Sequence, residues 1–420
     1  MISKYLKNTI TLFSGNIISQ LFTILSLPIL TRLYSSIQLG EYFVFLSITI
    51  ILSSVFSLQS HLTIVLGKCI NEASQNLKYS IIIITSNHLF LLISILIFQS
   101  YLTQDMGFNI SSKYILFYPL SSFLTALSIS FESFLNHQKS YLNISKLKAL
   151  KVGIILTLQL ILPLIIKPNN YILVISQITG LFIIDIIYIF KLQTFLVAPF
   201  NTHFTSYLNS HKNILMYNTG MATLNTASNH IPLLLINSLF GASYASFFGL
   251  AIRIASTPFN MFGQSLGMVY YQKGAQIINY KKRLSPLFNK TVMILFKFGI
   301  FPFFLIIIFS NTAIDFILGN EYKVTGQVIL ILSPMLFVSF LISAISYTVE
   351  ILRLQRQMIW YDFLLFLLRT STIIAGFYVF KSFFSAIVLF STIGILLGTL
   401  FFFTIKHHTK RYDLSLNTIL

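Results

Sequence analysis

Twelve long apolar segments run along this chain of 420 residues, and its Lys and Arg residues gather in every second gap between them. A bilayer core about 30 Å thick needs ~20 predominantly apolar residues per helix. The segments therefore predict twelve transmembrane helices. Their approximate ranges are Thr9–Leu30, Tyr42–Leu66, Tyr79–Tyr101, Tyr114–Leu135, Val152–Ile166, Tyr171–Phe190, Ile214–Phe240, Ala245–Tyr271, Val292–Phe309, Val328–Leu352, Trp360–Phe380 and Phe383–Ile405.

The placement of the basic residues predicts the orientation of these helices. Loops on the cytoplasmic side of a membrane carry an excess of Lys and Arg. Of the 28 basic residues, twenty lie at the termini or in the even-numbered gaps and five in the odd-numbered gaps. Both termini are thus expected in the cytoplasm, which requires an even number of spans. The twenty residues are Lys4, Lys7, Lys68, Lys78, Lys139, Lys146, Lys148, Lys151, Lys191, Lys212, Lys273, Lys281, Lys282, Arg283, Lys290, Arg353, Arg356, Lys406, Lys410 and Arg411.

The composition argues against a soluble protein. Only 9% of the residues are charged, whereas soluble domains average about 25%. The net charge of +18 could indicate nucleic-acid binding, but that would need a basic face on a soluble fold. Short basic clusters between apolar helices instead indicate attraction to anionic membrane lipid, so no nucleic-acid partner is expected. The apolar stretch near the N-terminus is too long for the apolar region of a cleaved signal peptide, and we interpret it as an uncleaved first span.

The sequence predicts neither a metal site nor a bound cofactor. Cys69 is the single cysteine, which excludes an intrachain disulfide and a cysteine-rich metal site. The histidines His61, His88 and His137 are scattered without partners at ligand spacing. No G-x-x-x-x-G-K-[ST] motif is present, so the chain is not expected to hydrolyse ATP itself.

The two halves of the chain are weakly similar. The longest polar stretch, 191–213, lies near the middle, and the LPIL of residues 27–30 corresponds to the IPLL of residues 231–234. Parallel repeats of this kind predict two six-helix bundles related by an axis along the membrane normal. We therefore expect an N-terminal bundle over 1–195, a cytoplasmic linker over 196–213 and a C-terminal bundle over 214–420. In the last span, Gly394 and Gly398 predict close helix packing.

Five motifs stand in a fixed order along the chain: LPILTRLYS at 27–35 with Gly40, IPLLL at 231–235, FGA at 240–242, AIR at 251–253 and FILGNEY at 316–322. With these motifs the chain resembles polysaccharide flippases, the O-antigen (Wzx-type) members of the multidrug/oligosaccharidyl-lipid/polysaccharide (MOP) exporter superfamily. Members often have proline and acidic residues just before the signature glycine, where this chain has the sequence SIQL at 36–39, so the local loop geometry is expected to differ.

The resemblance implies an all-α, MATE-like membrane protein with about twelve helices in two bundles around a central cavity. It implies a flippase, not an enzyme, in the cell inner membrane. The expected substrate is an oligosaccharide linked through pyrophosphate to undecaprenol, such as an O-antigen repeat unit for lipopolysaccharide. This substrate would move from the cytoplasmic to the periplasmic leaflet by alternating access. Besides the glycan carrier and membrane lipids, the resemblance suggests a polysaccharide polymerase and a chain-length regulator as partners.

Three arginines are the candidate substrate-binding residues. Arg253 lies inside the eighth span, where burying a charge costs roughly 3 kcal/mol, and its guanidinium can bind phosphate as a bidentate fork. For Arg369, in the eleventh span, cavity lining and structural pairing are equally good interpretations. Arg32 belongs to the flippase signature, and a role as an interfacial residue that reaches toward water is nearly as good an interpretation.

Acidic residues are few in the predicted spans. Asp185, near the middle of the sixth span, could bind a coupling proton or Na⁺, or it could pair with an arginine. Glu132 and Glu350 lie near cytoplasmic span ends, where helix capping or pairing with a lysine is the favoured interpretation.

Three other functions make different demands on the sequence. A flippase of the lipid II branch of the superfamily usually has a longer chain with two extra spans. A drug or cation antiporter of the same superfamily would share the helices, but its cavity should favour acidic residues, whereas arginine and lysine predominate here. A membrane-embedded polysaccharide polymerase would carry a large periplasmic loop, and the longest odd-numbered gap, Ser310–Gln327, is short.

Overall fold

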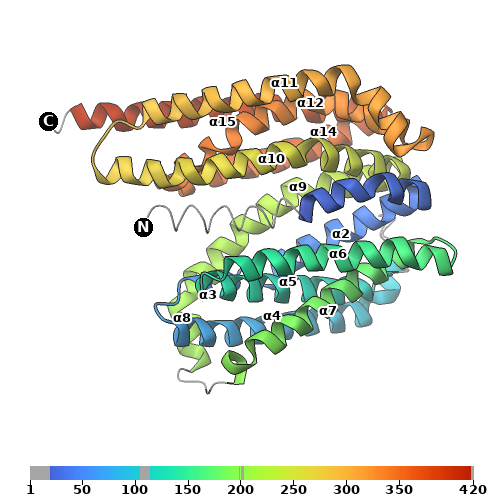
Figure 1. Cartoon of the computed structure of the whole chain (residues 1–420), viewed down its shortest axis with the longest axis horizontal. Coiled ribbons are helices and arrows are strands. Elements are labelled where there is room, and N and C mark those ends of the chain that lie inside the picture. The colour runs from blue at the N-terminus through green and yellow to red at the C-terminus, as the bar shows by residue number, and fades with distance from the viewer. Residues whose placement is uncertain (1–18, 105–113, 198, 200–202, 418–420) are drawn as a thin grey trace. The chain divides into compact units, whose positions relative to one another are not determined.

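A computed structural model of the chain describes residues 19–104, 114–197, 199 and 203–417. These residues form helices joined by short connections, with no β-strand among them (Figure 1). The predicted start of the first span at Thr9, together with Lys4, Lys7 and Lys113, lies outside the described residues. The chain packs as two compact units, Met1–Ala245 and Ser246–Leu420, and each is described by itself.

The first unit contains the helices of the first half and one more. Its first helix has the bounds Ser19–Leu33. The elements that follow are α2 (Ser36–Phe56), α3 (His61–Val65), α4 (Ile70–Gln104), α5 (Phe117–His137), α6 (Tyr141–Ile165), α7 (Asn170–Val197), α8 (Phe204–Asn213), the π-helical turn η2 (Ile214–Asn218) and α9 (Thr219–Phe240).

The second unit is built from the remaining long helices. Helix α10 begins close to the start of this unit. Helices α11, α12 and α15 of the unit lie side by side (Figure 1). The elements are α10 (Ala242–Asn279), α11 (Ser285–Leu318), η3 (Asn320–Tyr322), α12 (Lys323–Ser343), η4 (Ile345–Tyr347), α13 (Thr348–Ile351), α14 (Gln355–Tyr378) and α15 (Phe383–Asn417).

A helix in the described residues corresponds to each of the twelve predicted spans. Eight of the described helices are long and apolar enough to cross a membrane. Several extend well past the apolar segment: α4 and α15 have 35 residues each, or about 52 Å of helix. Hydropathy misses these extensions because their residues are polar. The stretch 196–213, predicted as a cytoplasmic linker, is also largely helical in its described residues, since α7 ends at Val197 and α8 covers Phe204–Asn213.

Helix α8 is attached to the rest of the first unit by Tyr207. This side chain is 3% exposed, and its hydroxyl lies 2.9 Å from the hydroxyl of Thr63. Burial raises the pKa of Tyr207 to about 12. The hydroxyl therefore stays protonated at neutral pH and can share a hydrogen bond with Thr63.

The residues that depart from the flippase signature form the first turn of α2. The hydroxyl of Ser35 accepts from the backbone N–H of Gln38, and the Gln38 side chain accepts from the backbone N–H of Ser35 at 3.0 Å. This reciprocal pair is a capping box, which satisfies N–H groups that a helix N-terminus otherwise leaves unbonded. The different residues at 36–39 thus begin the helix with side-chain capping.

Helices α2 and α9 pack together along their length. Gly40 meets the backbone of Ala242, just after the end of α9. Farther along, His230 Nδ1 lies 3.2 Å from the Ser47 hydroxyl. The first helix of the second half of the sequence therefore packs against the second helix of the first half.

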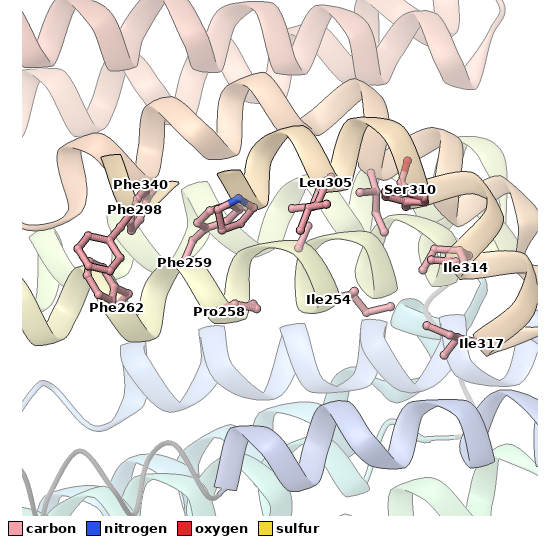
Figure 2. A pocket seen from close by; sticks show the side chains of 16 residues that line it. Ile254, Pro258, Phe259, Phe262, Phe298, Leu305, Ser310, Ile314, Ile317 and Phe340 are labelled. Atoms are coloured by element: carbon pink, nitrogen blue, oxygen red, sulfur yellow. The ribbon is translucent and has the colours of Figure 1, made fainter. Parts of the chain in front are cut away.

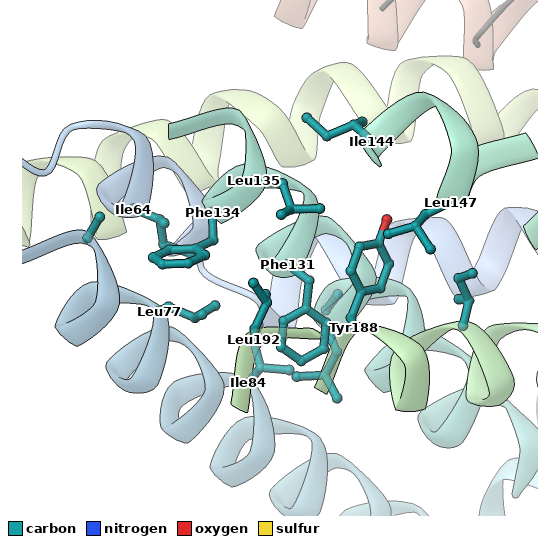
Figure 3. Close-up of a cluster of buried hydrophobic side chains, with 14 residues drawn as sticks. Ile64, Leu77, Ile84, Phe131, Phe134, Leu135, Ile144, Leu147, Tyr188 and Leu192 are labelled. Carbon is teal, nitrogen blue, oxygen red and sulfur yellow. The ribbon is translucent and has the colours of Figure 1, made fainter. Parts of the chain in front are cut away.

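Each unit has an apolar interior. In the first, a cluster around Phe131, Phe134 and Tyr188 contains side chains from each of the helices α3, α4, α5, α6 and α7 (Figure 3). In the second, Gly394 and Gly398 of α15 face Met335 and Val338 of α12, so close that a Cβ at either glycine would overlap the facing side chain. The close packing predicted for this glycine pair is confirmed.

Candidate functional site

Helix α10 carries polar residues along one face. Arg253, Thr257, Asn260 and Gln264 are spaced at i, i+4, i+7 and i+11, which places them on one side of a helix. Arg253 and Thr257 are half-buried, and Asn260 and Gln264 are exposed on the second unit. We refer to these four residues as the α10 polar stripe. Of these four residues only Arg253 was predicted from the sequence, although the other three follow it at helical spacing.

The opposite face of α10 lines an apolar pocket of about 560 Å³ that also involves α11 and α12. Figure 2 shows Phe262, Phe298 and Phe340 at one end of this pocket, and Ile254 and Ile317 at the other. Among its sixteen described lining residues, Ser310 has the only polar side chain. The pocket can therefore accept a hydrocarbon chain but offers little to a sugar or a phosphate.

Arg369 packs against aromatic side chains within the second unit. The carbon at the centre of its guanidinium lies 5.4 Å from the centroid of the Phe390 ring on α15. Phe390 in turn meets Phe248 of α10 edge-on, with the ring centroids 5.7 Å apart. A cation over an aromatic face is a favourable structural contact. Of the two interpretations of Arg369, this contact favours structural pairing.

Arg32 is exposed at the end of the first helix. Its signature neighbour Tyr34 is 1% exposed and donates a 2.8 Å hydrogen bond to the carbonyl of Gln159 on α6. The signature thus includes a residue that fixes the turn between the first helix and α2. Arg32 itself is exposed beside that turn, which is compatible both with substrate binding and with a role as an interfacial residue.

Asp185 is buried inside the first unit, between α7 and α5. Its side chain is 2% exposed, and its Oδ1 accepts a 2.6 Å hydrogen bond from the hydroxyl of Ser128. Asp185 makes no contact with an arginine among the described residues. Pairing with an arginine, one of its three predicted roles, therefore has no support in this structure.

Glu132, one turn from Ser128 on α5, forms two ion pairs. Its carboxylate lies 3.1 Å from Lys148 Nζ and 3.3 Å from Lys151 Nζ, both on α6. The predicted pairing of Glu132 with lysine is confirmed.

The predicted site residues are divided between the two units. Arg253 and Arg369 belong to the second unit, and Arg32 and Asp185 to the first. Among the described residues there is no group of three or more His, Cys, Asp or Glu side chains that could hold a metal ion. The polar groups described here offer charge and hydrogen bonds to a polar, anionic molecule.

Comparison with protein families identifies the chain. The model of a family described as polysaccharide biosynthesis protein matches residues 68–327, which is more than half of the chain. The chain belongs to this family. No curated protein sequence matches it. The match spans α4 to the start of α12 and therefore includes both α7 with Asp185 and α10 with Arg253.

Solved structures share the fold of this family member. The structure of the lipid II flippase MurJ in its inward closed conformation aligns with a TM-score of 0.76 and 16% identity, over 98% of this chain and 91% of that one. The inward-facing structure of a multidrug resistance MATE transporter of the MOP superfamily aligns with a TM-score of 0.73 and 12% identity, over 94% and 95% of the two chains.

A third structure of this fold comes from Pyrococcus furiosus. It is a MOP superfamily transporter described as having a binding pocket of reverse polarity, and it aligns with a TM-score of 0.63 and 10% identity, over 97% and 96% of the two chains. The predicted fold class is confirmed: the described residues are helical, and the chain is a multi-pass membrane protein with the MATE-like fold of these structures.

Proposed function

We propose that the protein is a flippase that carries undecaprenyl-pyrophosphate-linked oligosaccharide from the cytoplasmic to the periplasmic leaflet of the inner membrane by alternating access. The observation that carries this proposal is the polysaccharide biosynthesis family match, which covers residues 68–327 on a transporter fold. The substrate class proposed is an O-antigen or similar surface polysaccharide repeat unit. The task breaks no covalent bond, so no catalytic residue is required.

The α10 polar stripe supports an anionic glycan as the substrate. Polar and charged side chains in a membrane-spanning helix usually face a water-filled space or the protein interior. Arg253 would bind the pyrophosphate or an acidic sugar through its guanidinium fork. Asn260 and Gln264, which are exposed on the same face, offer amides that can both donate to and accept from sugar hydroxyls. Arg369 and Arg32 remain secondary candidates for the same role.

The apolar pocket supports a lipid-linked substrate. A polyprenyl tail must stay in a hydrocarbon environment while its headgroup crosses the membrane. The pocket lies on the face of α10 opposite the polar stripe, and its lining is almost entirely carbon. One helix would thus separate the surface for the polar headgroup from the surface for the tail.

The membrane potential would favour the proposed direction of transport. A negative charge that leaves the cytoplasm gains about 2.3 kcal/mol per 100 mV. For two negative charges and ~150 mV, the gain is roughly 7 kcal/mol.

The proposal is tested by reconstitution. The purified protein is placed in liposomes that contain the pyrophosphate-linked oligosaccharide, and glycan reaching the opposite leaflet is measured with a membrane-impermeant lectin or glycosidase. The proposal expects protein-dependent transfer. Extrusion of an organic cation without glycan transfer would instead identify an antiporter, and glycan chains that grow longer would identify a polymerase. Glu350→Gln, at a span end, serves as a control that should leave the transfer rate near normal.

The proposed orientation is tested separately by cysteine labelling in a Cys69→Ala background. Lys146→Cys and Lys282→Cys are expected to resist membrane-impermeant maleimide in intact cells and to react after the cells are opened. Lys323→Cys, in an odd-numbered gap, is expected to react in intact cells. All three lysines are exposed, so burial would not block labelling. Labelling of position 146 or 282 from outside would overturn the orientation.

A further inference from the structure

Asp185 has a carboxylate oxygen to which the first unit offers no partner. Oδ1 accepts the hydrogen bond from Ser128. Oδ2 is buried and accepts no hydrogen bond from the described residues. An ionised carboxylate in this position would be poorly stabilised, and buried carboxyl groups of this kind take up a proton or bind a cation. Asp185 is therefore a candidate binding site for a proton or a metal cation.

Ionisable side chains surround Asp185. Among the described residues, the charged side chains within electrostatic reach of it are Lys151 of α6 and Glu132 of α5. Tyr188, one turn farther along α7, is within reach of both carboxylates. Its hydroxyl is buried without a hydrogen-bond partner, and Figure 3 shows it directed toward Leu147 on α6. The ionisable side chains that interact with Asp185 among the described residues are thus Glu132, Lys151 and Tyr188.

A column of polar residues connects Asp185 to one end of the first unit. Ser128 and Glu132 are spaced at i and i+4 on α5, so Glu132 lies one turn, about 6 Å, farther along the same face. Glu132 pairs with Lys148 and Lys151. The side chain of Lys148 is 29% exposed, so the column reaches the surface at that end. In the proposed orientation, this is the cytoplasmic end of α5.

We propose that Asp185 is a proton-binding site that exchanges its proton with the cytoplasmic side along the column formed by Ser128, Glu132 and Lys151. A proton from cytoplasmic water adds to the Asp185 carboxylate and gives the neutral acid, and the reverse step returns it. No other bond forms or breaks. The inference deepens the proposed function, because it names the ion that could couple to glycan export and the side on which that ion is exchanged, and its coupling role rests on that function.

A proton fits this site better than Na⁺. Hard metal cations need several oxygen ligands, whereas the described residues offer one carboxylate and the hydroxyls of Ser128 and Tyr188. The Ser128 hydroxyl already donates its hydrogen toward Oδ1.

Infrared spectroscopy of the purified full chain in lipid nanodiscs tests the site without any substrate. The carbonyl stretch of a protonated carboxyl group is expected at low pH and should disappear as the pH rises. Asp185→Asn should remove this band. Asp362→Asn, which removes a half-buried carboxyl from α14 of the second unit, is the matched control and should leave the Asp185 band in place.

Two further variants test the column. Glu132→Gln removes a negative charge beside two lysines, so the Asp185 band should titrate at a lower pH than in the unmodified protein. Lys151→Met removes a positive charge and should move the titration to a higher pH. A band from a carboxyl group remote from both residues would not shift in opposite directions in these two variants. Shifts of the same sign, or no shift in either variant, would overturn the role of the column.

Two spectroscopic outcomes would overturn the proton site itself. A band that persists to the highest pH at which the protein stays folded would identify a permanently neutral, structural acid. A band that is lost when Na⁺ is added at constant pH would identify a metal-cation site.

A transport measurement tests the coupling. In liposomes with a pH difference across the membrane, the unmodified protein should move the glycan lipid faster than without the difference, and Asp185→Asn should show no such acceleration. One outcome would be that neither the unmodified protein nor Asp185→Asn moves the glycan, while the infrared band still titrates as expected. In that case the proposed function fails and the proton site stands. If glycan transfer is normal and Asp185→Asn responds to the pH difference like the unmodified protein, the coupling role fails.

Discussion

Arg253→Ala is expected to abolish the export of surface polysaccharide in cells, although the protein still reaches the membrane. The arginine occupies a membrane-spanning helix together with exposed amide side chains on the same face. Hydrogen bonds to charged groups contribute about 1.5–3 kcal/mol each. The loss of a guanidinium fork on a pyrophosphate should therefore weaken substrate binding by on the order of tenfold or more. Complementation of a deletion strain, with membrane levels measured in parallel, provides the test.

Two variants separate the charge of Arg253 from its shape. Arg253→Lys should retain partial activity, because the positive charge remains while the bidentate geometry is lost. Lys297→Ala removes an exposed cation from α11, near the cytoplasmic end of the predicted span Val292–Phe309, and should leave export near normal. Full complementation by Arg253→Ala at low expression would show that this residue is not essential, and Arg369 would become the next candidate.

Much of the fold could be predicted because a bilayer imposes a length and an apolar composition on each span. The twelve segments appear as helices for this reason, and the close contact at Gly394 and Gly398 follows from their spacing. The helix ends could not be read in the same way. Residues such as Glu72 and Asp413 lie in helices that continue beyond the apolar stretch, where hydropathy carries no signal.

The polar site was only partly predictable, because single charged residues are visible in a hydropathy profile and their partners are not. Arg253 and Asp185 could be identified as charges inside apolar segments. The hydrogen bond from Ser128 to Asp185 joins residues 57 positions apart, and nothing local in the sequence indicates it. Asn260 and Gln264 were missed for another reason: neutral amides hardly lower the average hydropathy, and only their helical spacing from Arg253 reveals them.

The glycines in the signature motifs are required for different structural reasons. Gly241 ends α9 with φ +100°, and Gly319 ends α11 with φ +92°. Residues other than glycine rarely adopt this backbone conformation. Gly40 has an ordinary helical conformation within α2, so its requirement must be steric. A Cβ at this position would overlap the carbonyl oxygen of Ala242, a backbone atom that cannot rotate away.

Gly40→Ala is therefore expected to lower the melting temperature of the purified protein and to reduce polysaccharide export strongly. Inserting a methyl group into a filled contact typically costs about 1–3 kcal/mol, and here the relief requires α2 to move away from the backbone that follows α9. Gly153→Ala is the matched control in the same unit. It lies within α6 with no neighbouring atom within 4 Å of the new Cβ, and alanine is favoured over glycine in a helix by roughly 0.5–1 kcal/mol.

The two variants should shift stability in opposite directions. Because both changes add the same methyl group to a helix, the helix-propensity gain is common to them, and only the contact with Ala242 differs. Thermal unfolding in detergent, followed by the loss of monodisperse protein, measures this difference directly. Equal melting temperatures for Gly40→Ala and Gly153→Ala would mean that α2 and the start of α10 are not held in the close contact described here, and the signature glycine would need another explanation.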